Sequence, residues 1–197
     1  MRNVQFTNDW FQLNRLEWEQ HLLPFKDKEI KAIEIGVFEG QATCWLLENV
    51  LTNSKSTIDC IDTFEGGVEH QASNVDMEKI SKRFEKNICE TVGGAEKVHT
   101  HIGKSQIILR EFKMDKYDIV YIDGSHMAKD VLEDAILSWR LLKVGGILIF
   151  DDYLWKQYDD PYSLPKTAIN AFLKLYIHDY ETLTMSREVI IRKIKQS

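Results

Sequence analysis

Three acidic residues and a histidine follow two apolar segments in the middle of the chain. Asp123 and His126 belong to the sequence Asp-Gly-Ser-His, and Asp151 and Asp152 form an adjacent acidic pair. Carboxylates that lie close together repel one another unless a proton or a metal ion intervenes. Oxygen ligands of this kind suit a hard divalent cation such as Mg²⁺. Asp123, Asp151 and Asp152 are therefore candidate metal ligands, with a simple cap or solvated loop as the alternative for the adjacent pair.

His126 is the candidate general base, because the ordinary pKa of a histidine lies near neutrality. At a strand end beside Asp123 it could take a proton from a substrate hydroxyl, and Asp123 is a second candidate for that step. A structural hydrogen bond is an equally good interpretation of His126. Asp123 and His126 are thus the candidate catalytic residues.

A turn with two glycines follows the first apolar segment. Gly36 and Gly40 lack a Cβ atom, so the backbone there can approach a ligand, and the ring of Phe38 could shield it. The turn lacks the third glycine of the dinucleotide-binding fingerprint. Glu34 and Glu39 bracket it with negative charge that would attract a cation and repel a diphosphate. A plain turn with two solvated glutamates is the alternative.

Asp62 ends the next apolar segment and is followed by Thr63. It lies 28 residues after Glu34 (62 − 34), one strand–helix–strand unit later, so both carboxylates should border one crevice. An acid at this position commonly accepts hydrogen bonds from a ribose diol, and a nicotinamide cofactor would use it equally. After the third apolar segment, the sequence Gly103-Lys104-Ser105 offers a small residue and a hydroxyl group where an adenine edge could lie.

The elements that must position these residues alternate along the chain. Between the strands, the spacing of apolar residues predicts helices over Asp76–Thr91 and Lys129–Leu142, and an opening helix over Asp9–Leu23. Two final segments, Glu181–Met185 and Glu188–Ile194, are close enough to form a hairpin. The five apolar, β-branched strands are predicted at Lys31–Ile35, Thr57–Ile61, Lys97–Ile102, Tyr117–Ile122 and Gly146–Phe150.

Apolar strands separated by helices indicate a parallel sheet covered on both faces. We expect an α/β fold with a Rossmann-like doubly wound sheet of seven strands, mostly parallel, with an antiparallel C-terminal hairpin. Such sheets bind ligands at the carboxyl ends of their strands. The 197 residues predict a single domain. Its predicted parts are an N-terminal helical segment (1–30), a cofactor-binding core (31–153), and an acceptor loop with the hairpin (154–197).

Composition narrows the class of partner. A net charge of −6 argues against nucleic acid, whose phosphates need a basic surface. No apolar run reaches the roughly 18 residues that span a membrane, and the N-terminus becomes polar too soon for a signal peptide. Cys44, Cys60 and Cys89 are predicted to be reduced and buried, which fits a cytoplasmic location.

These motifs together resemble the class I S-adenosylmethionine-dependent methyltransferases over about Ala32–Tyr153. The Asp-Gly-x-His turn and the acidic pair are similar to a bacterial branch that includes small-molecule O-methyltransferases, such as those acting on macrolide sugars. The chain departs from the commonest family turn by having Val-Phe-Glu in place of a third glycine.

The resemblance implies a role for each motif. In this family the glycine turn with Glu34 cradles the methionine part of the cofactor, and Asp62 binds the ribose. The segment Gly103–Ser105 lines the adenine, and Asp123 borders the cofactor. In metal-dependent members the matching acids, here Asp123, Asp151 and Asp152, hold Mg²⁺, which acidifies the acceptor hydroxyl.

We therefore expect an S-adenosylmethionine-dependent methyltransferase that methylates an oxygen of a small hydroxylated acceptor with the help of Mg²⁺. A nicotinamide-dependent oxidoreductase on a similar fold is one alternative. A non-catalytic module that binds S-adenosylmethionine or a protein is the other. No nucleic acid or membrane partner is expected, and homo-oligomers are common among small domains of this kind.

Overall fold

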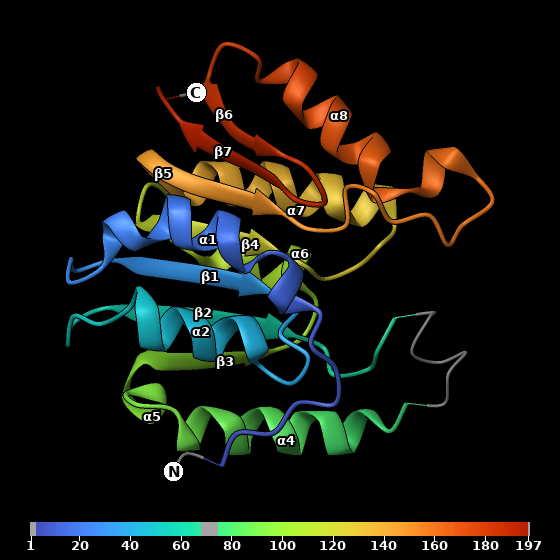
Figure 1. The fold of residues 1–197 in the computed structure, drawn as a ribbon. Coiled ribbons are helices and arrows are strands. Elements are labelled where there is room, and N and C mark those ends of the chain that lie inside the picture. Colours follow the sequence, from blue (N-terminus) through green and yellow to red (C-terminus); the bar gives the residue numbers. More distant parts are fainter. Residues whose placement is uncertain (1–2, 68–74, 197) are drawn as a thin grey trace.

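The computed structural model describes residues 3–67 and 75–196, and it contains a seven-stranded sheet (Figure 1). The strand order is β3-β2-β1-β4-β5-β7-β6. Strands β1 to β5 pair in parallel, whereas β7 runs antiparallel to both β5 and β6. This confirms the predicted doubly wound sheet with its C-terminal hairpin. The strands are β1 (Lys31–Ile35), β2 (Thr57–Asp62), β3 (Val98–Ile102), β4 (Tyr117–Ile122), β5 (Leu142–Phe150), β6 (Tyr180–Met185) and β7 (Val189–Lys193).

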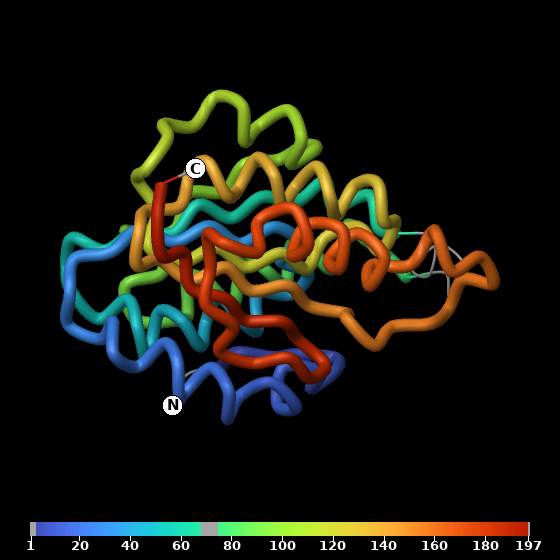
Figure 2. Tube along the Cα trace, turned by 90° about the horizontal axis from the view of Figure 1, so that it is seen from above, coloured from blue at the N-terminus to red at the C-terminus, as the bar shows by residue number. Residues whose placement is uncertain are grey.

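Helices cover both faces of this sheet, as the view in Figure 2 shows. Residues of α1, α2 and α4 form one hydrophobic core with one face of the sheet, and α7 and α8 form a second core with the other. The α-helices are α1 (Arg15–Leu22), α2 (Gln41–Asn49), α4 (Met77–Glu90), α5 (Gly94–Lys97), α6 (Ser105–Ile108), α7 (Ala128–Leu141) and α8 (Pro165–Leu175). Short 3₁₀ helices are η1 (Phe11–Leu13), η2 (Leu23–Phe25), η3 (Leu109–Glu111) and η4 (Pro161–Ser163).

The apolar spacing of α4 explains why it forms and which face it buries. Its Ile80, Phe84 and Ile88 recur at steps of four and are buried, and Phe84 and Ile88 belong to the core that α2 forms with the sheet. Asp76 is the N-cap, and its carboxylate accepts a hydrogen bond from the backbone N–H of Lys79. Both features agree with the sequence. Burying each large apolar side chain contributes about 1.5–3 kcal/mol to stability.

Three expectations need correction. The opening α-helix begins only at Arg15, because residues 9–14 form an irregular segment with the short 3₁₀ helix η1, whose Phe11 ring packs against Trp18 and Trp45. Strand β5 begins at Leu142, four residues earlier than predicted. Cys44 and Cys60 are buried as expected, but Cys89 is exposed, because it lies on the face of α4 that points away from the core.

The part of the chain that the structure describes contains no helix long and apolar enough to cross a membrane. The parallel strands of Figure 1 all point toward the same end of the sheet, where the loop after β5 also lies. This carboxyl end carries every residue that the sequence marked as chemically significant.

Candidate active site at the carboxyl ends of the strands

The strand register brings three turns side by side. Ile35 of β1 is paired with Ile122 of β4, which is paired with Phe150 of β5. The ladder continues by one hydrogen bond past each strand: the Asp123 N–H donates to the Ile35 carbonyl at 2.8 Å, and the Asp151 N–H to the Ile122 carbonyl at 3.0 Å. The glycine turn, the Asp-Gly-Ser-His turn and the acidic pair are therefore neighbours.

Gly36 allows two of these turns to touch. Its φ is +82°, and a Cβ atom there would lie 2.0 Å from the carbonyl oxygen of Asp123. No side chain fits in that space. Gly40 ends the turn at φ +79°, where a Cβ atom would lie 2.9 Å from the ring of Phe84. The two glycines are thus required by packing between turns and against α4, besides any role in approaching a ligand.

The carboxylate of Asp62 organises the same turn. It accepts hydrogen bonds from the backbone N–H groups of Val37 at 2.8 Å and Phe38 at 3.2 Å through one oxygen, and from Phe64 at 2.8 Å through the other. A carboxylate has about four acceptor positions, so it can still accept from a hydroxyl group. The neighbouring Thr63 hydroxyl accepts from the N–H of Glu65. Sequence reasoning anticipated a ribose ligand at Asp62 and missed this structural role.

Glu34 is a buried acid beneath the glycine turn. Its side chain is 1% exposed and accepts a 2.7 Å hydrogen bond from the Thr43 hydroxyl of α2. Burial raises the pKa of Glu34 to about 8, despite the opposing effect of the Thr43 hydrogen bond. Glu34 is therefore largely protonated at neutral pH, and a cation beside it would favour the charged form.

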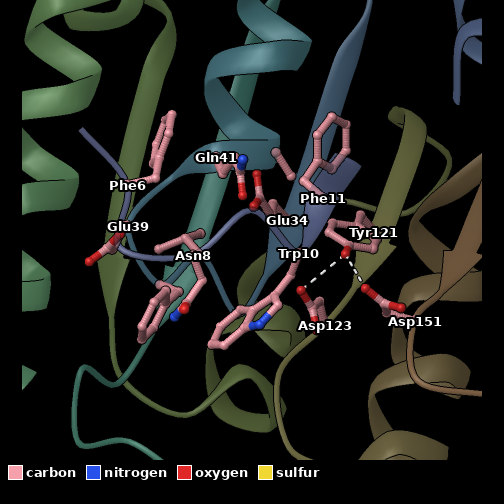
Figure 3. Close-up of a pocket in the computed structure, with 14 residues that line it drawn as sticks. Phe6, Asn8, Trp10, Phe11, Glu34, Glu39, Gln41, Tyr121, Asp123 and Asp151 are labelled. Atoms are coloured by element: carbon pink, nitrogen blue, oxygen red, sulfur yellow. Dashed lines mark hydrogen bonds between the residues drawn. The ribbon is translucent and has the colours of Figure 1, made fainter. Parts of the chain in front are cut away.

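Tyr121 links two of the predicted acids. Its hydroxyl lies 2.6 Å from Asp151 Oδ2 and 3.0 Å from Asp123 Oδ2 (Figure 3). Burial, followed by the charges of Asp151 and Asp152, raises the pKa of Asp123 well above its usual value. Burial and the charge of Asp152 raise the pKa of Asp151 to about 6. The raised pKa values show that burial and mutual repulsion disfavour the charged forms of these acids. A bound cation would favour the charged forms, so the arrangement is typical of a cation-binding site.

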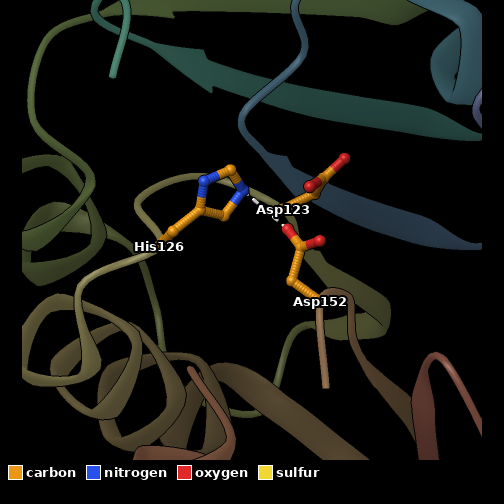
Figure 4. A group of neighbouring side chains, drawn as sticks. All are labelled: Asp123, His126 and Asp152. Carbon is orange, nitrogen blue, oxygen red and sulfur yellow. Dashed lines mark ion pairs between the residues drawn. The ribbon is translucent and has the colours of Figure 1, made fainter. Parts of the chain in front are cut away.

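Asp151 and Asp152 point in different directions, so the acidic pair is divided between two groups. Asp151 accepts from Tyr121 through one oxygen and from the backbone N–H of Asp152 through the other. Asp152 has φ +60° and its Oδ2 lies 2.6 Å from Nε2 of His126 (Figure 4). Among the described residues, one potential ligand atom each of Asp123, His126 and Asp152 all lie within 4.8 Å of one another. The structure thus assembles His126 with two of the three predicted acids.

The turn after β3 contacts a further buried acid, which comes from α7. Ser105 Oγ donates to Asp134 of α7 at 2.7 Å, and the Gln106 amide donates to the same oxygen at 3.0 Å. Burial raises the pKa of Asp134 to about 7. Gly103 adopts φ +147° and its N–H donates to the Asp62 carbonyl, whereas Lys104 is exposed. Sequence analysis did not identify Gln106 or Asp134, since α7 lies far along the chain.

An N-terminal strap, residues 5–14, covers the site, and nothing in the sequence indicated this. The Thr7 N–H and hydroxyl donate to the Glu39 carboxylate at 2.6 and 2.9 Å, and the Trp10 ring packs on Phe38 with centroids 5.4 Å apart. The backbone of Gln5 exchanges two 2.9 Å hydrogen bonds with the buried side chain of Asn87. The strap is therefore held by side chains from the glycine turn and α4.

A cavity of about 70 Å³ remains under the strap (Figure 3). It is bordered by Trp10 and Phe11 on one side and by Glu34, Tyr121 and Asp123 on the other. Ligand pockets usually enclose at least about 300 Å³. A cofactor of the size of S-adenosylmethionine would therefore have to displace part of the strap.

Comparison with known proteins identifies the family. A family model described as a methyltransferase domain matches residues 33–153, more than half of the chain. An uncharacterised protein, R132 of Acanthamoeba polyphaga mimivirus, is 22% identical over 131 residues. That match covers 66% of this chain and 54% of the relative, so the chain spans about half the length of that protein.

Solved structures share the fold. The O-methyltransferase TomG of Streptomyces achromogenes, in complex with S-adenosylmethionine, has a TM-score of 0.65 at 14% identity and covers 99% of this chain and 84% of its own. An O-methyltransferase of Bacillus cereus has a TM-score of 0.67 at 15% identity, covering 98% and 85%. MycE, from mycinamycin biosynthesis, has a TM-score of 0.62 at 16% identity. That match covers 97% of this chain and 51% of the MycE chain. The chain belongs to the methyltransferase domain family.

Proposed function

We propose that the chain transfers the methyl group of S-adenosylmethionine to an oxygen atom of a small hydroxylated acceptor, with the assistance of a divalent cation. The observation that carries this proposal is the meeting of Asp123, His126 and Asp152 beside an acid-lined cavity at the strand ends. Two of the related structures are O-methyltransferases, which supports oxygen as the acceptor atom.

The donor fits the charges of the cavity. S-adenosylmethionine carries a sulfonium and an ammonium group, and Glu34 and Asp123 border the space in which its methionine part would lie. Burial raises the pKa of both carboxyls, and a cation bound beside them would lower these pKa values because it favours the charged forms. Asp62 would accept from the ribose, and the turn Gly103–Ser105 would border the adenine. Phe38 would shield the methionine part.

The donor set fits a divalent cation. Asp123 and Asp152 offer carboxylate oxygens at one point, and His126 beside them would stay outside the ligand set, because a nitrogen that holds a cation cannot accept the hydroxyl proton. Asp151 would have to leave Tyr121 and the Asp152 backbone to become a ligand, so Asp123 and Asp152 are the ligands that we propose first. A bound cation lowers the pKa of an acceptor hydroxyl. The related MycE structure is a complex with Mg, which supports a divalent cation as a cofactor.

The residues of the chain supply position and proton transfer. The acceptor oxygen attacks the methyl carbon in line with the bond to sulfur, and the sulfur leaves with that electron pair. The hydroxyl proton passes to His126, whose Nε2 now faces Asp152. Asp123 is the alternative proton acceptor. The first part of the loop after β5, residues 153–158, would border the acceptor.

The proposal also covers the domain organisation, the class of acceptor and the location of the protein. Residues 1–197 would act as a single domain, with 31–153 binding the cofactor and 154–197 contributing the acceptor loop and hairpin. The net charge of −6 disfavours a polyanionic acceptor such as RNA, so we propose a small molecule. A cytoplasmic location is proposed on the thiol state expected of Cys44 and Cys60, which are buried without a disulfide partner among the described residues.

Calorimetry with S-adenosylmethionine and with NAD⁺ tests the donor. The proposal expects binding of the first and none of the second, whereas binding of NAD⁺ alone would refute it. The cation is tested separately by adding excess EDTA to a methyl-transfer assay and by Asp152→Asn. Transfer at an undiminished rate under both conditions would show that the proposed cation has no role.

A further inference from the structure

The loop after β5 folds back onto the candidate base. The indole ring of Trp155 stacks on the imidazole ring of His126, with centroids 4.6 Å apart and an interplanar angle of 30°. Tyr158 makes an edge contact with the same Trp155 ring, with centroids 4.6 Å apart at 73°. Ring contacts therefore run from Tyr158 in the loop through Trp155 to His126 at the strand-end site.

Two contacts together fix the imidazole ring. The torsion that rotates a histidine ring has broad energy wells, so the ring does not hold a single plane by itself. Here Asp152 Oδ2 contacts one edge of the His126 ring at 2.6 Å, and Trp155 covers one face. The carboxylate sets the direction of Nε2, and the indole sets the plane in which that nitrogen lies.

Trp155 differs from its neighbours in the loop, because its side chain contacts the site. Its neighbour Leu154 is exposed to solvent, whereas the Trp155 ring turns inward to the site. The Tyr162 side chain, farther along the same loop, is 80% exposed. Only some aromatic residues of the loop therefore contact the site, and an aromatic-rich composition alone does not explain the stack.

We propose that Trp155 is a positioning residue for methyl transfer, which acts by holding the imidazole of His126 in the orientation that accepts the hydroxyl proton. This inference rests on the proposed function, because it assigns the proton to His126. It also connects the loop to the reaction: when the loop leaves the site, the imidazole loses the surface that sets its plane.

Steady-state kinetics of Trp155→Ala and Trp155→Phe test the inference, with Tyr162→Ala as the matched control in the same loop. Trp155→Ala should lower kcat roughly tenfold, the scale expected when one aromatic contact is lost. Trp155→Phe should restore most of kcat, and the calorimetric Kd for S-adenosylmethionine should stay within about twofold in all three. An unchanged kcat in Trp155→Ala, or a rise in KM for the acceptor alone, would overturn the inference.

Proton NMR provides a readout that needs no turnover. The imidazole C–H resonance of His126, assigned by its loss in His126→Asn, should lie upfield because of the indole ring current. It should move downfield in Trp155→Ala and stay in place in Tyr162→Ala. An unchanged chemical shift of this resonance in Trp155→Ala would overturn the inference, whatever the kinetics show. A resonance that responds in a protein that binds S-adenosylmethionine but methylates no acceptor would support the stack and refute the proposed function instead.

Discussion

Glu34 should make the affinity for S-adenosylmethionine depend on pH. Burial raises the pKa of this carboxyl to about 8, and a cationic ligand beside it binds the charged form. The charged fraction is about 1% at pH 6 and about 9% at pH 7, so the affinity should rise about ninefold over that interval, or about 1.3 kcal/mol. It should rise further toward pH 8 and then level off.

Calorimetry in buffers of different ionisation enthalpy measures this effect directly. At pH 6.5 the wild type should release about one proton per bound cofactor. Glu34→Gln keeps an oxygen that can accept from Thr43 but cannot become charged, so it should bind more weakly at pH 8 and should release fewer protons. Glu188→Gln is the matched control, because Glu188 is also buried with a pKa of about 9 but accepts from Trp18 and does not border the cavity.

The same shift affects folding. A carboxyl whose pKa is raised in the folded protein binds more protons there than in the unfolded chain. Glu34 therefore adds stability below its ordinary pKa, and this contribution is lost as the pH rises toward about 8. Urea denaturation of Glu34→Gln should show a weaker decline of stability over this range. The reasoning fails if the cofactor affinity of the wild type is flat from pH 6 to 8, or if Glu34→Gln binds and releases protons like the wild type.

Three further predictions follow from the geometry of the site. Gly36→Ala places a Cβ atom 2.0 Å from the Asp123 carbonyl oxygen and should cost more than about 3 kcal/mol in urea denaturation. Gly145→Ala, at φ +87° with no atom within 4 Å, should cost only the backbone strain of about 1–2 kcal/mol, and equal losses would refute the packing argument. Asp152→Asn should lower the cation-stimulated rate of methyl transfer at least tenfold, and a normal response to added Mg²⁺ would exclude Asp152 as a ligand. Thr7→Val removes a strap hydrogen bond to a buried carboxylate and should speed cofactor association several-fold in stopped-flow fluorescence, whereas a slower or equal rate would show that the strap does not limit entry.

The strands and the site edge could be predicted from local patterns. The segment Tyr117–Ile122 is apolar except at Asp118 and is observed with the same bounds, because a buried parallel strand favours that pattern. Glu34 and Asp62 lie within the last two residues of their strands, and Asp123 follows its strand directly, so knowing the strands placed all three at one end of the sheet. These acids could be placed because each one is adjacent in sequence to the strand end that positions it.

The directions of the acidic side chains were harder to predict. Asp151 and Asp152 follow the last residue of β5, and Asp152 has a left-handed backbone with φ +60°. The side chain of Asp151 contacts Tyr121, and that of Asp152 contacts His126. No residue pattern marked this backbone conformation, so the prediction that three carboxylates converge could not include it.

The strap could not be predicted, because its contacts join distant parts of the chain. Thr7 and Glu39 lie 32 residues apart, and Gln5 and Asn87 lie 82 apart. The sequence predicts a helix over residues 9–14 of the strap, and the structure shows none of that α-helix before Arg15. The conformation of the strap is determined by the carboxylate and amide groups that satisfy its backbone, and these come from α4 and the glycine turn.

Methyl transfer from S-adenosylmethionine labelled with ¹³C in the methyl group is the most direct test of the central claim. The full chain should be incubated with Mg²⁺ and a panel of hydroxylated sugars, phenols and small acids, and followed by NMR. The account predicts that the labelled methyl resonance moves from the sulfonium position to that of a methyl ether or ester for at least one acceptor, and that His126→Asn slows this change. A label that stays on sulfur with every acceptor, or that appears on nitrogen, would contradict it.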